Sequence, residues 1–275
     1  MKTSQATCLV LAFMLGISRS VAADQPAKVT EVVNVVDHGT TESETSPATI
    51  GTLVHDGEYL KTGVRSRAEI LLPTASVTRL GAYTIFNYSV ESNTVDLQAG
   101  TILFCKPKNA PHLNIKTEAV TAGITGTTGF VSVQGSGSKK TYIFGIIEGH
   151  ASATANGTNF SVGRGDILEF RPGLKPFMFA FDLPRFVKSS PLLNKFKGTL
   201  PNQSYIDAAL DNYNNEVSRG FIEPPSQAID YSGDIPILST ASYDSAQNSQ
   251  DRSKAAPASS QPTGTSTFSP TKGGG

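Results

Sequence analysis

Hydrophobic and polar positions alternate over short stretches between about residue 28 and residue 182. Short runs rich in β-branched and aromatic residues are separated by Gly, Asn, Ser and Pro, and no long 3.6-residue periodicity appears. This pattern is typical of an antiparallel sandwich, barrel or roll. The expected strands are residues 29–36, 68–72, 83–86, 95–97, 101–104, 112–116, 129–134, 141–148, 150–155, 159–162 and 167–170.

A short turn motif recurs within this β region. Four times an apolar residue, two further residues and a glycine precede a new strand, with the glycine at Gly57, Gly100, Gly149 and Gly165. Because glycine has no Cβ, it adopts a positive φ at a tight turn without a clash. The spacings are irregular, so we interpret the motif as a repeated turn device and not as the period of a solenoid.

The residues that follow the β region are basic at first. Residues 183–198 include Arg185, Lys188, Lys195 and Lys197 and no acidic residue. We interpret them as a solvated connector, with a specific anion site as the alternative. The whole connecting region is expected to run from 183 to 231.

A single amphipathic helix is predicted within this region, over residues 204–219. Ile206, Leu210, Tyr213 and Val217 would form one helical stripe, and Arg219-Gly220 would end the helix. The spacing of Ser204 and Asp207 also suggests a capping box. We expect this helix to dock on the β region, with binding of a partner as the alternative role.

Both ends of the chain differ from the β region in composition. Residues 1–23 resemble a signal peptide, with Lys2, a short apolar run over 9–17 and a small-residue cleavage site at 21–23. Cleavage after Ala23 would place the protein in the periplasm or outside the cell. The apolar run is too short to span a bilayer, and no transmembrane segment is expected elsewhere. Residues 232–275 are dominated by Ser, Thr, Pro, Ala and Gly, which predicts a disordered tail.

Composition narrows the range of partners. Lys plus Arg and Asp plus Glu each number 23, so the formal net charge is +0, and no nucleic-acid partner is expected. Removal of the signal peptide would leave Cys105 as the one cysteine, in an expected strand. We therefore interpret Cys105 as a small buried hydrophobe in preference to a reactive thiol.

Patterns that carry catalytic chemistry are missing from the sequence. His38, His55, His112 and His150 include no closely spaced ligand pair, and no Gly-x-Ser-x-Gly motif occurs. Residues 123–129 are glycine-rich but lack the Lys-Ser/Thr ending of a phosphate loop and lead into a strand. The absence of tryptophan argues against a typical sugar-stacking cleft. We predict a protein that is not an enzyme, with no catalytic, metal or cofactor-binding residues and no cofactor.

An ordered set of motifs between residues 54 and 172 resembles the FecR domain family of bacterial periplasmic proteins. The opening motifs are residues 57–63 (GEYLKTG) and 66–72 (SRAEILL), followed by 95–104 (VDLQAGTILF). The later motifs are residues 115–131 (IKTEAVTAGITGTTGFV), 147–149 (IEG) and 162–166 (VGRGD). The resemblance implies an all-β FecR-type domain over residues 28–182, built as a sandwich, a roll or a β-helix-like stack.

The resemblance also implies a function. Signalling members of the family carry a cytoplasmic anti-sigma region and a transmembrane helix, and this sequence shows neither. We therefore expect an exported protein-binding or regulatory module of the cell envelope, with another envelope protein as its partner. The alternative is an envelope-associated structural or glycan-binding β protein that contacts cell-wall polysaccharide.

Overall fold

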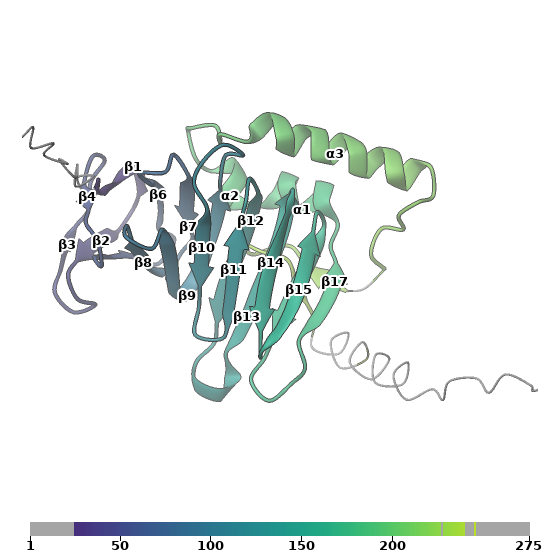
Figure 1. Ribbon diagram of the computed structural model, residues 1–275, viewed down its shortest axis with the longest axis horizontal. Coiled ribbons are helices and arrows are strands. Elements are labelled where there is room, and N and C mark those ends of the chain that lie inside the picture. Colours follow the sequence, from purple (N-terminus) through teal and green to yellow (C-terminus); the bar gives the residue numbers. More distant parts are fainter. Residues whose placement is uncertain (1–24, 227, 240–244, 246–275) are drawn as a thin grey trace, which may run out of the picture.

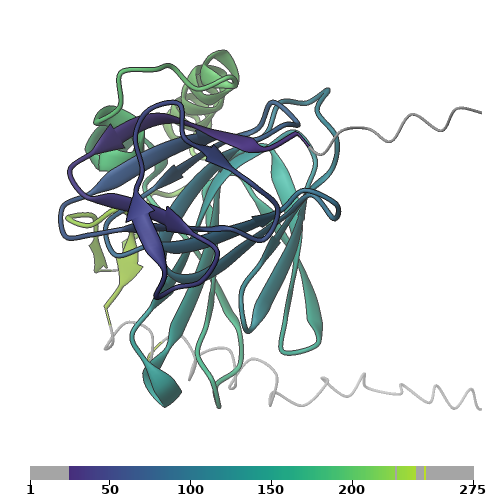
Figure 2. The same ribbon diagram turned by 90° about the vertical axis from the view of Figure 1, so that its left-hand side faces the viewer.

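The computed structural model describes residues 25–226, 228–239 and 245. It is an all-β structure in which strands β1 to β17 form one continuous sheet that folds into two facing layers (Figures 1 and 2). We call them the helix-covered layer and the open layer. The all-β fold expected from the alternating pattern is thus confirmed, and its form is a sandwich.

The helix-covered layer carries helices on its outer face. Apart from half of β9 (Thr94–Cys105), its strands, in spatial order, are β4 (Leu53–Val54), β1 (Ala27–Val33), β6 (Arg67–Leu71), β7 (Val77–Leu80), β12 (Thr128–Gln134), β13 (Thr141–Glu148), β16 (Asp166–Phe170) and β17 (Phe177–Ala180). A short 3-10 helix, Gly137–Lys139, lies between β12 and β13.

The open layer contains the other half of β9. Its remaining strands, in spatial order, are β3 (Thr45–Pro47), β2 (Val36–Gly39), β5 (Tyr59–Thr62), β8 (Ile85–Ser89), β10 (Leu113–Lys116), β11 (Val120–Ile124), β14 (His150–Ala155) and β15 (Thr158–Gly163). β9 follows β8 in this order. The β9–β10 pair is parallel, whereas the sequence pattern had suggested an antiparallel arrangement throughout.

Strand β9 passes from one layer into the other at Gly100. Residues 94–99 pair with β8, and residues 101–105 pair with β7 and β12. Gly100 has φ +83°, and a Cβ there would lie 2.4 Å from Thr84 Cα. The sequence placed a turn between two strands here, and the structure has a bend within one strand. Gly57, Gly100, Gly149 and Gly165 all have positive φ, as their motif predicted.

The main hydrophobic core lies between the two layers. On β9, Val95, Leu97, Ile102 and Phe104 point into it and are fully buried. The alternation of side chains along a strand directs the intervening residues to the outer faces. Those outer positions are polar on the open layer and largely apolar on the helix-covered layer.

A second hydrophobic core covers the outer face of the helix-covered layer. Leu103 of β9, Phe130 of β12 and Ile143 of β13 are buried there, beneath helices α1 (Leu183–Ser189) and α2 (Pro191–Asn194) and helix α3 (Gln203–Ser218). Because both faces of these central strands are covered, their sequences are almost continuously apolar. Phe130 packs against Phe186 of α1, with 4.9 Å between the ring centroids.

The solvated connector predicted for residues 183–198 is wrong. Leu183, Phe186 and Leu192 are buried in the second core, and the segment forms two short helices. The basic residues of this segment lie on its outer side, where Lys188, Lys195 and Lys197 are exposed. The excess of basic residues in the sequence of this segment therefore obscured the apolar residues on its inner face.

Helix α3 spans Gln203–Ser218, where the sequence predicted a helix over 204–219. It runs along the strand ends at the top of Figure 1. Ile206 and Tyr213 are buried in the second core. The capping box is wrong, because the helix begins at Gln203 and Ser204 lies within it. The helix ends as expected, with Gly220 at φ +71° just beyond it.

The predicted tail begins too early. A two-stranded sheet of β18 (Ile229–Asp230) and β19 (Ile237–Leu238) follows α3, and Tyr231, Ile235 and Leu238 are buried in the second core. The remainder of the predicted tail lies outside the described residues except for Ser245. The predicted signal peptide, 1–23, also lies outside them. Among the described residues, no helix is long and apolar enough to cross a membrane.

Candidate interaction surfaces

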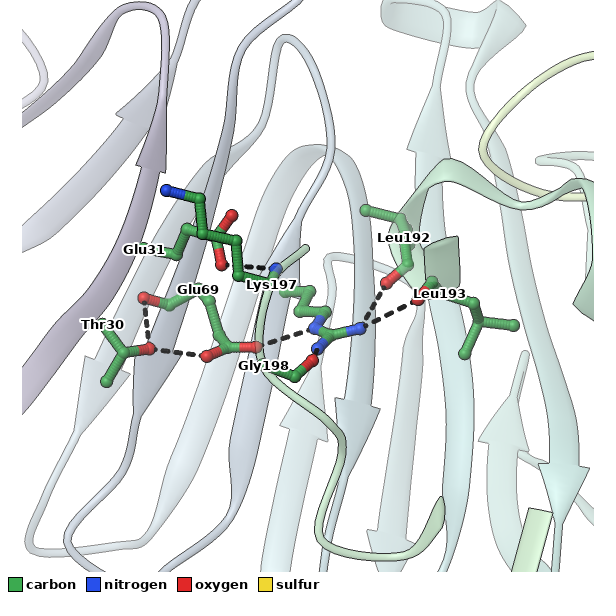
Figure 3. A network of polar contacts seen from close by, with 8 residues as sticks. Thr30, Glu31, Glu69, Leu192, Leu193, Lys197 and Gly198 are labelled. Atoms are coloured by element: carbon green, nitrogen blue, oxygen red, sulfur yellow. Dashed lines mark hydrogen bonds and ion pairs between the residues drawn. The ribbon is translucent and has the colours of Figure 1, made fainter. Parts of the chain in front are cut away.

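A buried arginine attaches the connector to the helix-covered layer (Figure 3). Arg79 of β7 is 1% exposed, and its Nε donates to Glu69 Oε2 at 2.8 Å. Its Nη1 donates to the carbonyl oxygens of Leu192 (3.0 Å) and Leu193 (3.3 Å), and its Nη2 donates to that of Gly198. The guanidinium is therefore paired and hydrogen-bonded, as a buried charge requires.

Neighbouring groups extend this network. Thr30 Oγ1 donates to Glu69 Oε1 (2.8 Å), the Lys197 amide donates to Glu31 Oε2 (2.9 Å), and the Phe196 ring lies 4.5 Å from the Arg79 guanidinium. The contacts join β1, β6 and β7 to residues 192–198. Because these contacts tie the connector to three strands of the layer, we interpret the network as structural.

A second buried polar cluster lies where α3 begins. Asn202 Nδ2 donates to the Lys106 carbonyl (3.0 Å) and to Thr128 Oγ1 (3.2 Å), and it also lies 3.4 Å from Glu148 Oε2. Burial raises the pKa of Glu148, which is 5% exposed. Cys105 lies beside this cluster, 3.5 Å from Thr128 Oγ1, and is fully buried. Burial raises its thiol pKa, which matches the expectation of a buried hydrophobe.

The four histidines lie at separate places in the fold. His38 is on β2, His55 follows β4, His112 precedes β10, and His150 begins β14. Within residues 25–226, 228–239 and 245, no group of three or more His, Cys, Asp or Glu side chains could hold a metal ion. The glycine-rich residues 123–129 span the end of β11, the connection over 125–127 and the start of β12.

The open layer presents a polar outer face. Lys116, Thr121, Ser152, Asn159 and Ser161 are exposed on neighbouring strands β10, β11, β14 and β15. Two hollows lie on this face. One, of about 420 Å³, is lined by Thr94, Asn114, Ile115, Lys116, Thr121, Ala122, Gly123, Ser152 and Thr154.

The second hollow, of about 350 Å³, is lined by charged residues. Asp96 and Lys116 face each other across β9 and β10, and burial raises the pKa of Asp96 while Lys116 opposes that shift. Glu118 accepts from Lys140 Nζ (2.6 Å) and from the Tyr142 hydroxyl (3.0 Å). Burial and the Glu118 carboxylate raise the Tyr142 pKa to about 12. The hollow is therefore lined mainly by polar and charged side chains.

Strand β15 forms the edge of the open layer. Thr158–Gly163 pairs with β14 along one side, and no ladder within the described residues uses its other side. Its sequence, TNFSVG, contains neither charge nor proline, and Thr158, Asn159 and Ser161 are exposed. Such an edge offers unpaired backbone N–H and C=O groups to another strand.

The other edges of the sheet are shorter. At the opposite end of the open layer, β3 has three residues and ends in Pro47, which has no N–H to donate. In the helix-covered layer, β4 has two residues and β17 has four. Short strands and proline both limit edge pairing. β15, with six residues, is therefore the edge best able to accept an added strand.

Sequence reasoning found some of these features and missed others. It placed residues 159–162 in a strand, but the position of that strand at an edge depends on pairing with β14, which the local pattern does not encode. It missed the burial of Arg79. The one available signal was a lone arginine inside the apolar strand Val77–Leu80.

Comparison with known proteins gives few matches. No curated protein sequence matches the chain. Two crystal structures, both described as a "putative anti-sigma factor from Parabacteroides distasonis", resemble it with a TM-score of 0.42 and 10% sequence identity in each case. Each covers 66% of this chain, and the chain covers 99% and 97% of their lengths. A likeness at this level carries no conclusion about function or partners here.

The family comparison is more specific. The model of the FecR protein family matches residues 58–151, from the turn before β5 into β14. This stretch contains β9, which joins the two layers, and most of the open layer. The FecR resemblance carried by the sequence motifs is therefore confirmed over residues 58–151.

Proposed function

We propose that this chain is an exported, non-catalytic protein-binding module of the cell envelope that recruits its partner by adding a strand to β15. The observation that carries the proposal is the uncharged edge strand β15, whose outer side joins no ladder within the described residues. The Gly163 amide at its end donates to Asp166 Oδ2 (3.2 Å), so residues 158–162 are the part offered for pairing. In strand addition, main-chain hydrogen bonds supply affinity, and side chains on alternate positions supply specificity. The FecR match over residues 58–151 supports a regulatory role for the module as a whole, and β15 lies just beyond the matched residues.

The two outer faces of the sandwich differ in a way that favours this role. The outer face of the helix-covered layer is occupied by the chain's own helices, whereas that of the open layer is polar and accessible. An added strand would extend the open layer and place its side chains beside Asn159 and Ser161. The shallow hollows on that layer support the alternative, glycan binding, less well. They contain no aromatic side chain on which a sugar ring could stack.

A matched pair of variants tests the proposal. Ser161 on β15 and Ser152 on β14 face each other, and both are exposed on the same layer. Ser161→Lys places a charge on the free edge, while Ser152→Lys places it one strand inward. Mature protein is used to capture partners from envelope extract and, separately, from cell-wall polysaccharide.

We expect one envelope protein to bind the wild type and Ser152→Lys, and to bind Ser161→Lys at least about tenfold more weakly, because an edge lysine opposes strand addition. Equal binding by both variants, or capture of polysaccharide alone, contradicts the proposal. Export is checked separately by mass spectrometry of the secreted or periplasmic protein, which should begin at Asp24. A secreted or periplasmic chain that still contains Cys8 would contradict cleavage after Ala23.

A further inference from the structure

Three adjacent turns at the N-terminal end of the sandwich expose large apolar side chains. We define the three-turn tip as residues 34–35 between β1 and β2, 63–66 between β5 and β6, and 81–84 between β7 and β8. Val35, Val64 and Tyr83 are 58%, 59% and 65% exposed. Single exposed apolar residues are common, but a cluster on neighbouring turns marks an interaction site.

Backbone hydrogen bonds hold the three turns together. The Gly63 amide donates to the Val35 carbonyl (3.0 Å), and the Tyr83 amide donates to the Gly63 carbonyl (3.3 Å). Ser66 Oγ accepts from the Val35 amide (3.0 Å) and donates to the Val64 carbonyl (3.0 Å). The three apolar side chains are therefore carried on one connected backbone.

Hydrogen bonds of two buried threonines, Thr62 and Thr84, connect the second and third turns of the tip. Thr62 Oγ1 donates to the Gly81 carbonyl (2.6 Å) and accepts from the Thr84 amide (2.8 Å). Thr84 Oγ1 donates to the same Gly81 carbonyl (2.9 Å). Both threonines are buried. A tip fixed in this way loses little conformational entropy on binding.

Each turn also contains one residue other than glycine with a positive φ angle. Asn34, Arg65 and Tyr83 have φ angles of +59°, +51° and +53°. The left-handed region is uncommon for residues other than glycine, and especially so for a bulky one such as tyrosine. Such conformations persist where the surrounding contacts impose them, and they gather at functional sites.

The polar groups of the tip favour one kind of partner. The Val35, Gly63, Val64 and Arg65 carbonyls and the Val35, Gly63 and Tyr83 amides are all hydrogen-bonded within the protein, the Arg65 carbonyl by Asn34 Nδ2 (2.6 Å). Internal bonding of this kind lowers the cost of bringing backbone against an apolar medium, and among the described residues the Val64 and Arg65 amides are the tip groups of the second turn without such a bond. Conversely, the bonded groups are not free for pairing with a partner's main chain.

Charge points in the same direction. Arg65 is exposed, and none of the three turns contains an acidic residue. The Asp234 carboxylate lies against the tip and accepts a hydrogen bond from the Ala82 amide. Burial raises the pKa of Asp234, and the positive charge of Arg67 acts against that rise. Tyrosine suits the boundary between apolar and aqueous regions, because its ring is apolar and its hydroxyl is polar. A nearby arginine adds attraction to anionic headgroups.

We propose that the three-turn tip docks on the surface of a lipid bilayer that contains anionic headgroups, with Val35, Val64 and Tyr83 in the interface and Arg65 at the headgroups. This function goes beyond the binding of a protein partner through β15. The strands that carry the tip, among them β1, β2, β6 and β8, are labelled toward the left of Figure 1, and β15 is labelled toward the right. A chain docked by its tip would keep β15 accessible to a partner.

The absence of tryptophan provides a direct test. Tyr83→Trp places the one tryptophan of the chain on the tip, and Phe221→Trp places it at a site beyond α3 that is 68% exposed. Each protein is mixed with vesicles of phosphatidylglycerol and phosphatidylcholine in equal parts, or of phosphatidylcholine alone. We expect the emission of Tyr83→Trp to shift to shorter wavelength with the mixed vesicles, and that of Phe221→Trp to stay unchanged.

Vesicle co-sedimentation then tests the apolar contacts in the otherwise unmodified chain. Val64→Asp should lower the partition into mixed vesicles at least about tenfold, because it removes the burial of a valine and adds repulsion. Tyr83→Ser should also lower it, and both variants should keep the thermal stability of the wild type. The proposal is overturned if Tyr83→Trp shows no shift, if Phe221→Trp shifts equally, if phosphatidylcholine alone binds as well, or if both stable variants sediment like the wild type.

Discussion

Arg79 donates to the carbonyl oxygen of Leu192 at 3.0 Å, although 113 residues separate them in the chain. The contact holds the α1–α2 segment against the helix-covered layer, and the carboxylate of Glu69 balances the buried charge. The connector is therefore part of the folded structure, and its loss should affect the whole sandwich.

Arg79→Ala tests this attachment. The substitution leaves Glu69 without its cation and three carbonyl groups without their donor. Breaking a buried pair typically costs about 3–5 kcal/mol. We expect a loss of this order in the free energy of unfolding by urea. Lys188→Ala, on the exposed side of α1, should change it by less than about 0.5 kcal/mol. Similar losses in the two variants would show that the network is unimportant.

The glycines of the turns should differ in their tolerance of a side chain. Gly100, Gly149 and Gly157 all have positive φ, but a Cβ would lie 2.4 Å from Thr84 Cα at Gly100, 3.1 Å from the Gly126 carbonyl oxygen at Gly149, and in open space at Gly157. Substitution by alanine at Gly157 should cost about 1 kcal/mol from the backbone alone. Gly149→Ala should cost more, and Gly100→Ala the most. Thermal unfolding measures the order, and an equal cost at all three positions contradicts it.

Truncation tests the role of the C-terminal segment. If residues 232–275 were a disordered tail, as their composition suggested, removing them would cost little stability. The structure predicts otherwise, because Tyr231, Ile235 and Leu238 are buried in the second core. Each buried side chain of this kind contributes roughly 1.5–3 kcal/mol. A chain ending after Ser239 should match the mature protein in melting temperature, and one ending after Gly220 should melt at least about 5 °C lower. Equal melting temperatures of the two truncated chains would show that residues 221–239 add nothing to the stability of the fold.

The pH dependence of stability should reflect Glu148. Its folded-state pKa is raised, chiefly by burial, so ionisation opposes folding. The stability associated with this group is complete below the unfolded pKa, which is near 4.5, and is lost as the pH rises through the folded value. Glu148→Gln should therefore be more stable than the wild type at pH 7, and the difference should shrink toward pH 4. Urea unfolding of both proteins at pH 7 and pH 4 measures this difference in stability. A Glu148→Gln variant that is less stable than the wild type at pH 7 would refute the prediction.

Much of the β structure could be predicted because strand alternation is local. The run from Ile102 to Cys105 is uniformly apolar, however, and its pattern alone does not show that Phe104 points between the layers while Leu103 points toward the helices. That division requires the long-range packing of α1 to α3. The same packing explains why Arg79 is buried.

The C-terminal errors have a similar physical origin. Residues 183–198 were assigned from their net charge, and the tail from its average composition. Neither the net charge nor the average composition shows the short apolar groups within these segments, such as Leu183 with Phe186 and Ile235 with Leu238. These groups pack into the second core. The free edge at β15 and the three-turn tip depend on which strands and turns become neighbours, and that information is spread over the whole chain.

Hydrogen–deuterium exchange of the chain with its captured envelope partner tests strand addition most directly. In the free protein, the outer backbone amides of residues 158–162 should exchange rapidly, because no ladder within the described part of the chain protects them. Strand addition predicts that the partner slows exchange within residues 158–163 and leaves β10 and β11 unchanged. Protection confined to the hollows of the open layer, or no new protection in β15, would contradict the account.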